Sequence, residues 1–331
     1  MLGANTHRNE SRRVPMISFL ASQDGRLVPQ ERLSPGCWVE VLEPSGRDLA
    51  WLGDKLAIAP EFLQEACDDE ETSHVDIDEE TGQVLVTVDC PFKRDDEDDP
   101  SVVQFDTHPL TFIFLPGHGG MVTVSLRPND ILDGFVRGAH RGVDTTRETR
   151  LLLLLLLKIA QRYLACLRSI NSQIRSSEDM LRKKMNNDEL MRMLSMEKSL
   201  VYFSTSIQGL QATAKRIGTG RTLALGDGDA ELLDDVLIEV SQAVEMCATC
   251  SQILNSVTDT FSNVISNNLN YTMRTLTVIT LIISIPAGIF GFYGMNVPDL
   301  PWVGSWVSAV AVSAVLVAVA WAVLRVMRLL K

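Results

Sequence analysis

TLTVITLIISIPAGIFGFY, residues 275–293, is a run of nineteen residues without a charged side chain. A second uncharged run, the twenty-two residues 303–324, follows after a short turn. A bilayer core about 30 Å thick is crossed by about 20 residues of α-helix. Core helices of soluble proteins are rarely apolar for this length, and two in tandem are rarer still. The sequence therefore predicts two transmembrane helices joined by a turn.

The charges around the two runs predict how this hairpin is oriented. The turn between the runs has no Lys or Arg and carries Asp299 as its charge. Because Lys and Arg concentrate on the cytoplasmic side of membranes, both ends are expected in the cytoplasm and the turn outside. No earlier segment is apolar for long enough to cross. The basic residues that flank the pair are Arg274, Arg325, Arg328 and Lys331.

One face of the first run is small or polar, and we call it the polar stripe. At about 3.6 residues per turn its members fall within an arc of roughly 100°. Small residues let transmembrane helices approach closely, whereas a polar stripe at membrane depth is tolerated where it faces water. Both interpretations are open, and the hydroxyl groups favour a pore. The polar stripe consists of Asn270, Met273, Thr277, Thr280, Ser284, Ala287 and Gly291.

Two further features of the first run concern its shape and its width. Pro286 removes one backbone N–H from the helix, so the Ile282 carbonyl loses its donor. We expect a kink or an exposed carbonyl there. Met273 and Leu276 are candidates for the first apolar constriction of a pore.

The residues at the end of the first run carry a family resemblance. Tyr293-Gly294-Met295-Asn296 closes the run, a short acidic turn with prolines follows, and a basic tail comes after the second run. Together these features resemble the CorA family of divalent-cation channels, which includes ZntB-like zinc transporters. The similarity spans most of the chain and is clearest in about the last 60 residues. Upstream, the segments that resemble the start of the family's cytosolic domain are 37–40, 49–56 and 60–66.

The resemblance implies a funnel-shaped homopentamer in which the first run lines a pore and Gly294, Met295 and Asn296 form its entrance. Mg²⁺ gives up its water reluctantly, so a ring of Asn296 amides suits an entrance that hydrogen-bonds the hydrated ion. Asn296 is equally able to act as a cap beside Gly294 at the helix end. Asp299 stands where the family often carries Glu, and an acidic ring there would concentrate cations.

Composition limits the other functions that the chain can have. The formal net charge of -12 argues against binding nucleic acid. The six cysteines lie in expected cytosolic segments, where thiols stay reduced. Cys247 and Cys250 have metal-ligand spacing, but a zinc site needs two more ligands. No pattern suggests a catalytic set, so we do not expect an enzyme.

The part of the chain before residue 130 alternates short apolar runs with turn residues. Runs rich in Val, Ile, Phe and Thr predict strands. Helical spacing is found at 46–55, where Ser45 is a plausible N-cap, and at 60–67, where Pro60 fits the first turn. These elements predict a small α/β layer domain. The expected strands are 16–20, 37–42, 83–88, 110–115 and 121–126.

A long helix is expected to lead into the membrane. From Ala230 onward, apolar residues alternate by four and three, which is a heptad seam. The seam becomes polar at residues 263–270, which suits a wet vestibule. The resemblance implies a regulatory cation site formed by Asp68 and Asp69 of one subunit with Asp235 of the next. The expected seam is 233, 237, 240, 244, 247, 251, 254, 258, 261, 265 and 268.

These features predict an α+β membrane protein with a cytosolic α/β layer domain, a long helical stalk and two C-terminal transmembrane helices. The expected divisions are a disordered tail at 1–14, the α/β domain at 15–140, a helical hairpin at 145–217, a linker at 218–229, the stalk at 230–272, the pore-lining helix at 273–293, the external loop at 294–301, the second transmembrane helix at 302–324 and a basic tail at 325–331.

The expected function is a homopentameric channel for divalent cations in a bacterial inner membrane, with both termini cytoplasmic and Mg²⁺ as the first choice of ion. A Zn²⁺, Co²⁺ or Ni²⁺ transporter of ZntB type is the alternative within transport, because the hydroxylated stripe leaves selectivity open. From another class, a membrane-tethered scaffold with the same fold that conducts little is also compatible with these residues.

Overall fold

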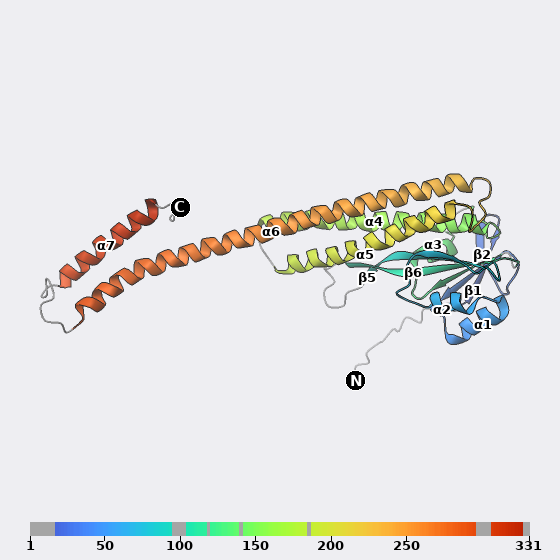
Figure 1. The fold of residues 1–331 in the computed structure, drawn as a ribbon, viewed down its shortest axis with the longest axis horizontal. Helices are drawn as coiled ribbons and strands as arrows, with labels where there is room; N and C mark the ends of the chain where they lie inside the picture. The colour runs from blue at the N-terminus through green and yellow to red at the C-terminus, as the bar shows by residue number, and fades with distance from the viewer. Residues whose placement is uncertain are drawn as a thin grey trace, which may run out of the picture. The chain divides into compact units, whose positions relative to one another are not determined.

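The computed structural model describes residues 17–94, 104–117, 120–138, 142–183, 187–295 and 306–326. By its internal contacts the chain divides into two compact units, Met1–Asn255 and Ser256–Lys331. The first unit holds a seven-stranded sheet with helices on both faces, and the second holds the apolar helices (Figure 1).

The sheet has the strand order β2-β1-β3-β7-β6-β5-β4. All neighbours are antiparallel except β3 and β7, which run parallel with Val39 opposite Val122. A strand is present at each of the five expected positions. The strands are β1 (Ile17–Gln23), β2 (Arg26–Gln30), β3 (Trp38–Leu42), β4 (His74–Ile77), β5 (Val84–Arg94), β6 (Gln104–Leu115) and β7 (Gly120–Ser125).

The two edge strands were not expected from the sequence. Strand β2 contains Pro29, and β4 contains Asp76, which is exposed and is paired with Leu85 of β5. An edge strand tolerates proline and charge because one side of its backbone is unpaired, so its sequence pattern is weak.

One face of the sheet packs against two short helices, α1 (Gly46–Leu56) and α2 (Pro60–Glu65). Ser45 caps α1 as expected, in a capping box with Asp48. Pro60 occupies the first turn of α2, as expected. The core beneath these helices is apolar. Its members include Val39, Val41, Leu52, Leu56, Phe62, Leu85, Ile113 and Val122.

The other face is covered by α3 (Asp130–Val136), α4 (Glu148–Lys183) and α5 (Asn187–Gly218). Trp38 is fully buried there, and its indole N–H donates to Thr123 Oγ1 at 2.9 Å. Tyr163 of α4 donates to the Asp89 carbonyl at 2.9 Å. The leucine run 151–157 is largely buried, as its apolar character on all sides predicts.

Helix α6 (Asp229–Tyr293) is 65 residues long, about 100 Å, and continues from the first unit into the second. Its first turns pack on α5, where Gln211 Nε2 donates to Ser241 Oγ at 3.1 Å. The buried side chains of α6 differ from the expected heptad seam, because residues 237, 244 and 251 are only half-buried. Contact with α5 places the buried seam on Leu233, Val236, Val240, Ala243, Cys247, Cys250 and Leu254.

Candidate functional site

The C-terminal part of α6 and helix α7 (Trp306–Val326) are long and apolar enough to cross a membrane. In the most apolar 18-residue window of each helix, only 6% and 11% of the residues are buried. A core helix of a soluble domain would be mostly buried. Leu276 and Ile283 are instead 58% and 63% exposed. Apolar surface of this extent calls for lipid or other protein around it.

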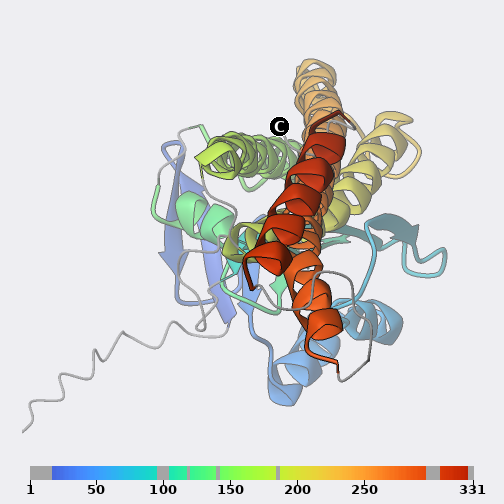
Figure 2. The same cartoon turned by 90° about the vertical axis from the view of Figure 1, so that its left-hand side faces the viewer.

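Helix α7 turns back along the end of α6 (Figures 1 and 2). On α7 the least exposed described residues are Ala309, Ser313 and Leu324, at 7%, 5% and 9%. On α6, buried or half-buried side chains recur at three- and four-residue steps, so they form one face. This contact face consists of Val278, Ile282, Ile285, Ile289 and Tyr293.

The polar stripe lies on the opposite side of α6 from this contact face. At about 100° per residue, the centres of the two faces are about 200° apart around the helix axis. The stripe is therefore not used to pack α6 against α7, and none of the residues that the structure describes buries it. All of its members are exposed: Asn270, Met273, Thr277, Thr280, Ser284, Ala287 and Gly291.

The hydroxyl groups of the stripe donate to the backbone of their own helix. Thr277 Oγ1 donates to the Met273 carbonyl at 2.8 Å, and Thr280 Oγ1 to the Leu276 carbonyl at 2.8 Å. Ser284 Oγ donates to the Thr280 carbonyl in the same way. Each hydroxyl proton is therefore satisfied without water, which membrane depth requires. The oxygen lone pairs remain as acceptors on the exposed side of the stripe.

Pro286 lies inside α6, and the helix continues past it to Tyr293. The Ile282 carbonyl therefore lacks its usual helical donor, as expected. Beyond the helix, the Gly294 N–H donates to the Phe290 carbonyl at 2.9 Å, and Met295 is 55% exposed. The other two residues of the expected entrance, Asn296 and Asp299, lie outside the described residues.

A long stretch of α6, which includes the first residues of the stripe, is exposed in the described structure. Between Phe261, which is 6% exposed, and Val278, at 8%, all sixteen residues are exposed. The stretch contains Asn263 and Asn267, which are exposed, and Leu269, which is 61% exposed, and a wet vestibule here stays a prediction. This stretch of α6 therefore exposes amide and apolar side chains together.

The expected regulatory residues do not form a metal site within one chain. Asp69 Oδ2 accepts from Arg127 Nη2 at 2.7 Å, and Asp68 Oδ1 accepts from the Glu70 N–H at 2.9 Å. Asp235 is exposed on α6. Among the described residues, no group of three His, Cys, Asp or Glu side chains is arranged to hold a metal ion. A site shared between subunits remains a prediction.

Sequence reasoning missed the group that anchors the start of α6. Asp229, which we assign to the linker, is buried, and its carboxylate accepts from Arg147 and Arg150 at 3.3 and 3.2 Å. Its other oxygen accepts from the Gly226 N–H at 2.9 Å. The sequence offered one signal for this role: an acidic residue at the start of a helix stabilises it, because the negative charge interacts favourably with the helix dipole.

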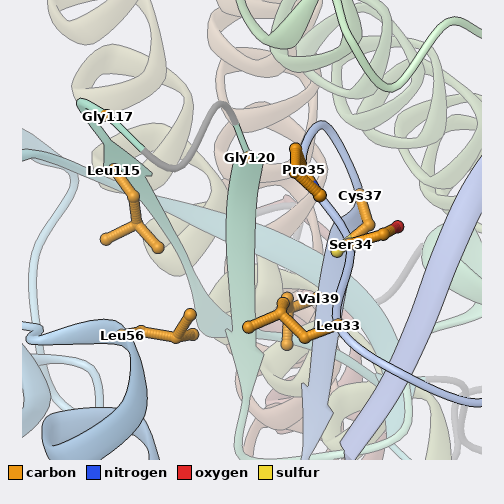
Figure 3. A pocket seen from close by; sticks show the side chains of 9 residues that line it. All are labelled: Leu33, Ser34, Pro35, Cys37, Val39, Leu56, Leu115, Gly117 and Gly120. Carbon is orange, nitrogen blue, oxygen red and sulfur yellow. The ribbon is translucent and has the colours of Figure 1, made fainter.

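A cavity of about 210 Å³ in the first unit has a different character (Figure 3). Leu33, Val39, Leu56 and Leu115 project into it from separate elements, and Cys37 lies at one side. Its described lining carries no charged side chain. Its described lining therefore offers no carboxylate for a hard divalent cation such as Mg²⁺.

Comparisons with known proteins converge on one family. A family model described as "CorA-like Mg2+ transporter protein" matches residues 35–326. The cobalt/magnesium transport protein CorA of Methanocaldococcus jannaschii is 23% identical over 289 residues. That alignment covers 87% of this chain and 85% of the relative.

Solved structures share the fold. The complete structure of the CorA magnesium transporter from Methanocaldococcus jannaschii matches with a TM-score of 0.77 at 20% identity, over 94% of this chain and 98% of that chain. The full-length CmaX protein matches with a TM-score of 0.69 at 14% identity, over 94% and 97%. The ZntB cytoplasmic domain from Vibrio parahaemolyticus matches with 0.59 at 8% identity, over 76% and 98%.

Proposed function

The chain belongs to the CorA-like Mg2+ transporter family, and we propose that it is a channel that carries divalent cations, Mg²⁺ first among them, across a bacterial inner membrane. The family is one of transporters, not of enzymes. Both helices that can cross a membrane lie within the matched residues 35–326. In this proposal both termini are cytoplasmic, in keeping with the basic residues that flank the hairpin.

The polar stripe is the observation that carries this proposal. Five copies of α6 around an axis would turn their stripes inward while α7 lies outside, because the stripe and the α7 contact face are on opposite sides of the helix. The hydroxyl oxygens of Thr277, Thr280 and Ser284 would then accept hydrogen bonds from the water shell of a cation. Met273 and Leu276, at the start of the stripe, would form an apolar constriction.

The entrance in this proposal is the Gly294-Met295-Asn296 turn with Asp299. A ring of neutral amides would hydrogen-bond the hydration shell without binding the ion too tightly to release it. Carboxylates of Asp299 would raise the local concentration of cations.

Gating would use the continuity of α6. One helix runs from Asp229 in the first unit through the stripe to Tyr293. Because no loop interrupts this helix, a tilt or bend at its start would be transmitted directly to the pore. Asp68 and Asp69 of one subunit with Asp235 of the next would hold a hydrated divalent ion and stabilise the closed state.

Two alternatives differ in what would be transported. The hydroxyl oxygens of the stripe favour a Zn²⁺, Co²⁺ or Ni²⁺ transporter, because they make the proposed ion path through the membrane less apolar. A non-conducting scaffold would assemble and show no uptake. Flux of Mg²⁺, Zn²⁺, Co²⁺ and Ni²⁺ into liposomes that contain the purified chain separates these cases.

The role of the stripe is tested by two identical substitutions. Thr280→Val removes a stripe hydroxyl and keeps the shape of the side chain. Thr275→Val removes a hydroxyl with the same type of back-bond, to the Tyr271 carbonyl at 2.9 Å, but lies off the stripe. Loss of about 1 kcal/mol of hydrogen bonding at the barrier predicts roughly fivefold slower Mg²⁺ flux for Thr280→Val. Equal flux in both variants would exclude the stripe as the ion path.

A further inference from the structure

Two adjoining cavities lie in the first unit on the face of the sheet that α3 and α4 cover, and they share no residue with the apolar cavity of Figure 3. One, of about 300 Å³, is lined by residues of β5 and β6, by the start of α3 and by Arg162 of α4. The other, of about 290 Å³, extends along α4 to Lys158. They share Asp130, Ile131 and Arg162, so together they form one groove, the α3–α4 groove.

His108 lies in the wall of this groove and is 2% exposed. The amide of Asn129 faces it, with Nδ2 at 3.4 Å from His108 Nε2. That amide cannot be reversed without loss, because its oxygen accepts from the N–H groups of Ile131 and Leu132 at 2.9 and 3.4 Å. Nδ2 is therefore the donor, His108 Nε2 is the acceptor, and the ring proton sits on Nδ1.

The Nδ1–H of His108 is left without an acceptor among the described residues. Burial, with the nearby Arg127 cation, lowers the pKa of His108 to about 4, so the ring is neutral at pH 7. A buried donor without a partner costs free energy unless a ligand or water supplies an oxygen.

Positive charge predominates along the groove. Lys93, Lys158 and Arg162 line it, against the single carboxylate of Asp130 among its described lining. Arg162 Nη2 donates to Asp130 Oδ2 at 3.2 Å. The Asp130 side chain is 85% exposed, so this ion pair is weak and an anionic ligand can replace Asp130 as the partner of Arg162. Lys158 Nζ donates to Gln161 Oε1 at 2.9 Å, which is a neutral partner. This local excess of cations stands out in a chain of net charge -12.

We propose that the α3–α4 groove binds a small polyanion, an oligophosphate or a polycarboxylate, whose oxygens accept from His108 Nδ1 and pair with Lys93, Arg162 and Lys158. A ligand with several anionic oxygens matches three separated cations better than a single-charge anion does. This site is distinct from the ion path, and its test measures binding, so the result does not depend on whether the chain conducts.

The test is isothermal titration of the full chain in detergent, stripped of divalent ions on a chelating resin, with sodium pyrophosphate and with citrate. We expect saturable binding of at least one of them, weakened at least tenfold in the double variant Lys158→Gln, Arg162→Gln. The double variant Arg168→Gln, Arg175→Gln is the control, since both residues are exposed on α4 outside the groove and the change in net charge is the same.

The two probes also identify the ligand class. Tighter binding of pyrophosphate assigns phosphate chemistry, and tighter binding of citrate assigns carboxylate chemistry. No binding of either at millimolar concentration, or equal weakening in the control variant, would overturn the proposal.

A second pair of variants tests the histidine. His108→Asn places an amide donor near the position of Nδ1, whereas His108→Gln places it near Nε2. We expect His108→Asn to bind within about threefold of the parent chain and His108→Gln to bind about tenfold more weakly, at matched thermal stability. The reverse order would show that Nδ1 does not face the ligand.

Discussion

Replacing Asp229 by Asn should loosen the start of α6, the helix that carries the polar stripe. The Asp229 side chain is 3% exposed and pairs with Arg147 and Arg150. Asn keeps an oxygen for the Gly226 N–H but removes the negative charge. Two guanidinium groups then lose their buried counter-ion, and we expect a lower free energy of unfolding.

The size of the effect follows from how exposed the partners are. Breaking a fully buried ion pair costs about 3–5 kcal/mol. Arg147 and Arg150 are 41% and 34% exposed, so water partly solvates them once the carboxylate is gone, and we expect about 2 kcal/mol. For a unit the size of Met1–Asn255, the unfolding entropy is about 0.5 kcal/mol/K, which gives a decrease of about 4 °C in Tm.

Thermal unfolding of the full chain in detergent, followed by tryptophan fluorescence, to which the buried Trp38 contributes, measures this shift. Asp234→Asn is the control, because Asp234 is exposed on the same helix. In a double-mutant cycle, Arg147→Gln should cost much less when Asp229 is already Asn. A Tm decrease below about 1 °C for Asp229→Asn, or fully additive effects in the cycle, would show that the ion pairs of Asp229 do not stabilise the start of α6.

Three further predictions concern separate parts of the chain. Burial, with the Asp133 charge, raises the pKa of Glu40 to about 7, so the folded chain holds a proton that the unfolded chain loses near pH 4.5. Stability should fall between pH 4.5 and 7, and Glu40→Gln should remove this slope and add about 2 kcal/mol at pH 8, measured by Tm against pH. Gly209→Ala should cost about 1–3 kcal/mol in denaturant unfolding, because a Cβ there would lie 2.8 Å from Ser73 Cβ. Asn296→Ala should abolish or scramble ion selectivity in the liposome assay.

Each of these predictions has a matched control or a contradicting result. Glu61→Gln, at an exposed position, should leave the pH slope unchanged. Gly46→Ala should be close to neutral, since nothing lies within 4 Å of a Cβ at that position. Unchanged flux and unchanged ion preference in Asn296→Ala would exclude the amide as the selective group.

The expected strands were found where their residues alternate or run apolar between turn residues. Strand β2 and strand β4 were missed, because their pairing comes from β1 and β5 and not from their own sequence. The seam of α6 shows the same limit. A four-and-three spacing fits 236, 243 and 250 as well as 237, 244 and 251, and contact with α5 selects the first set.

The amino-acid sequence alone determined the two membrane-spanning helices and the stripe of small and hydroxylated residues, because hydropathy and a period of about 3.6 are local properties. Tertiary structure decided which side of α6 is covered by α7, and it brought Asp229 to Arg147 and His108 to Asn129. Those outcomes depend on contacts between residues far apart in the chain, which no local spacing specifies.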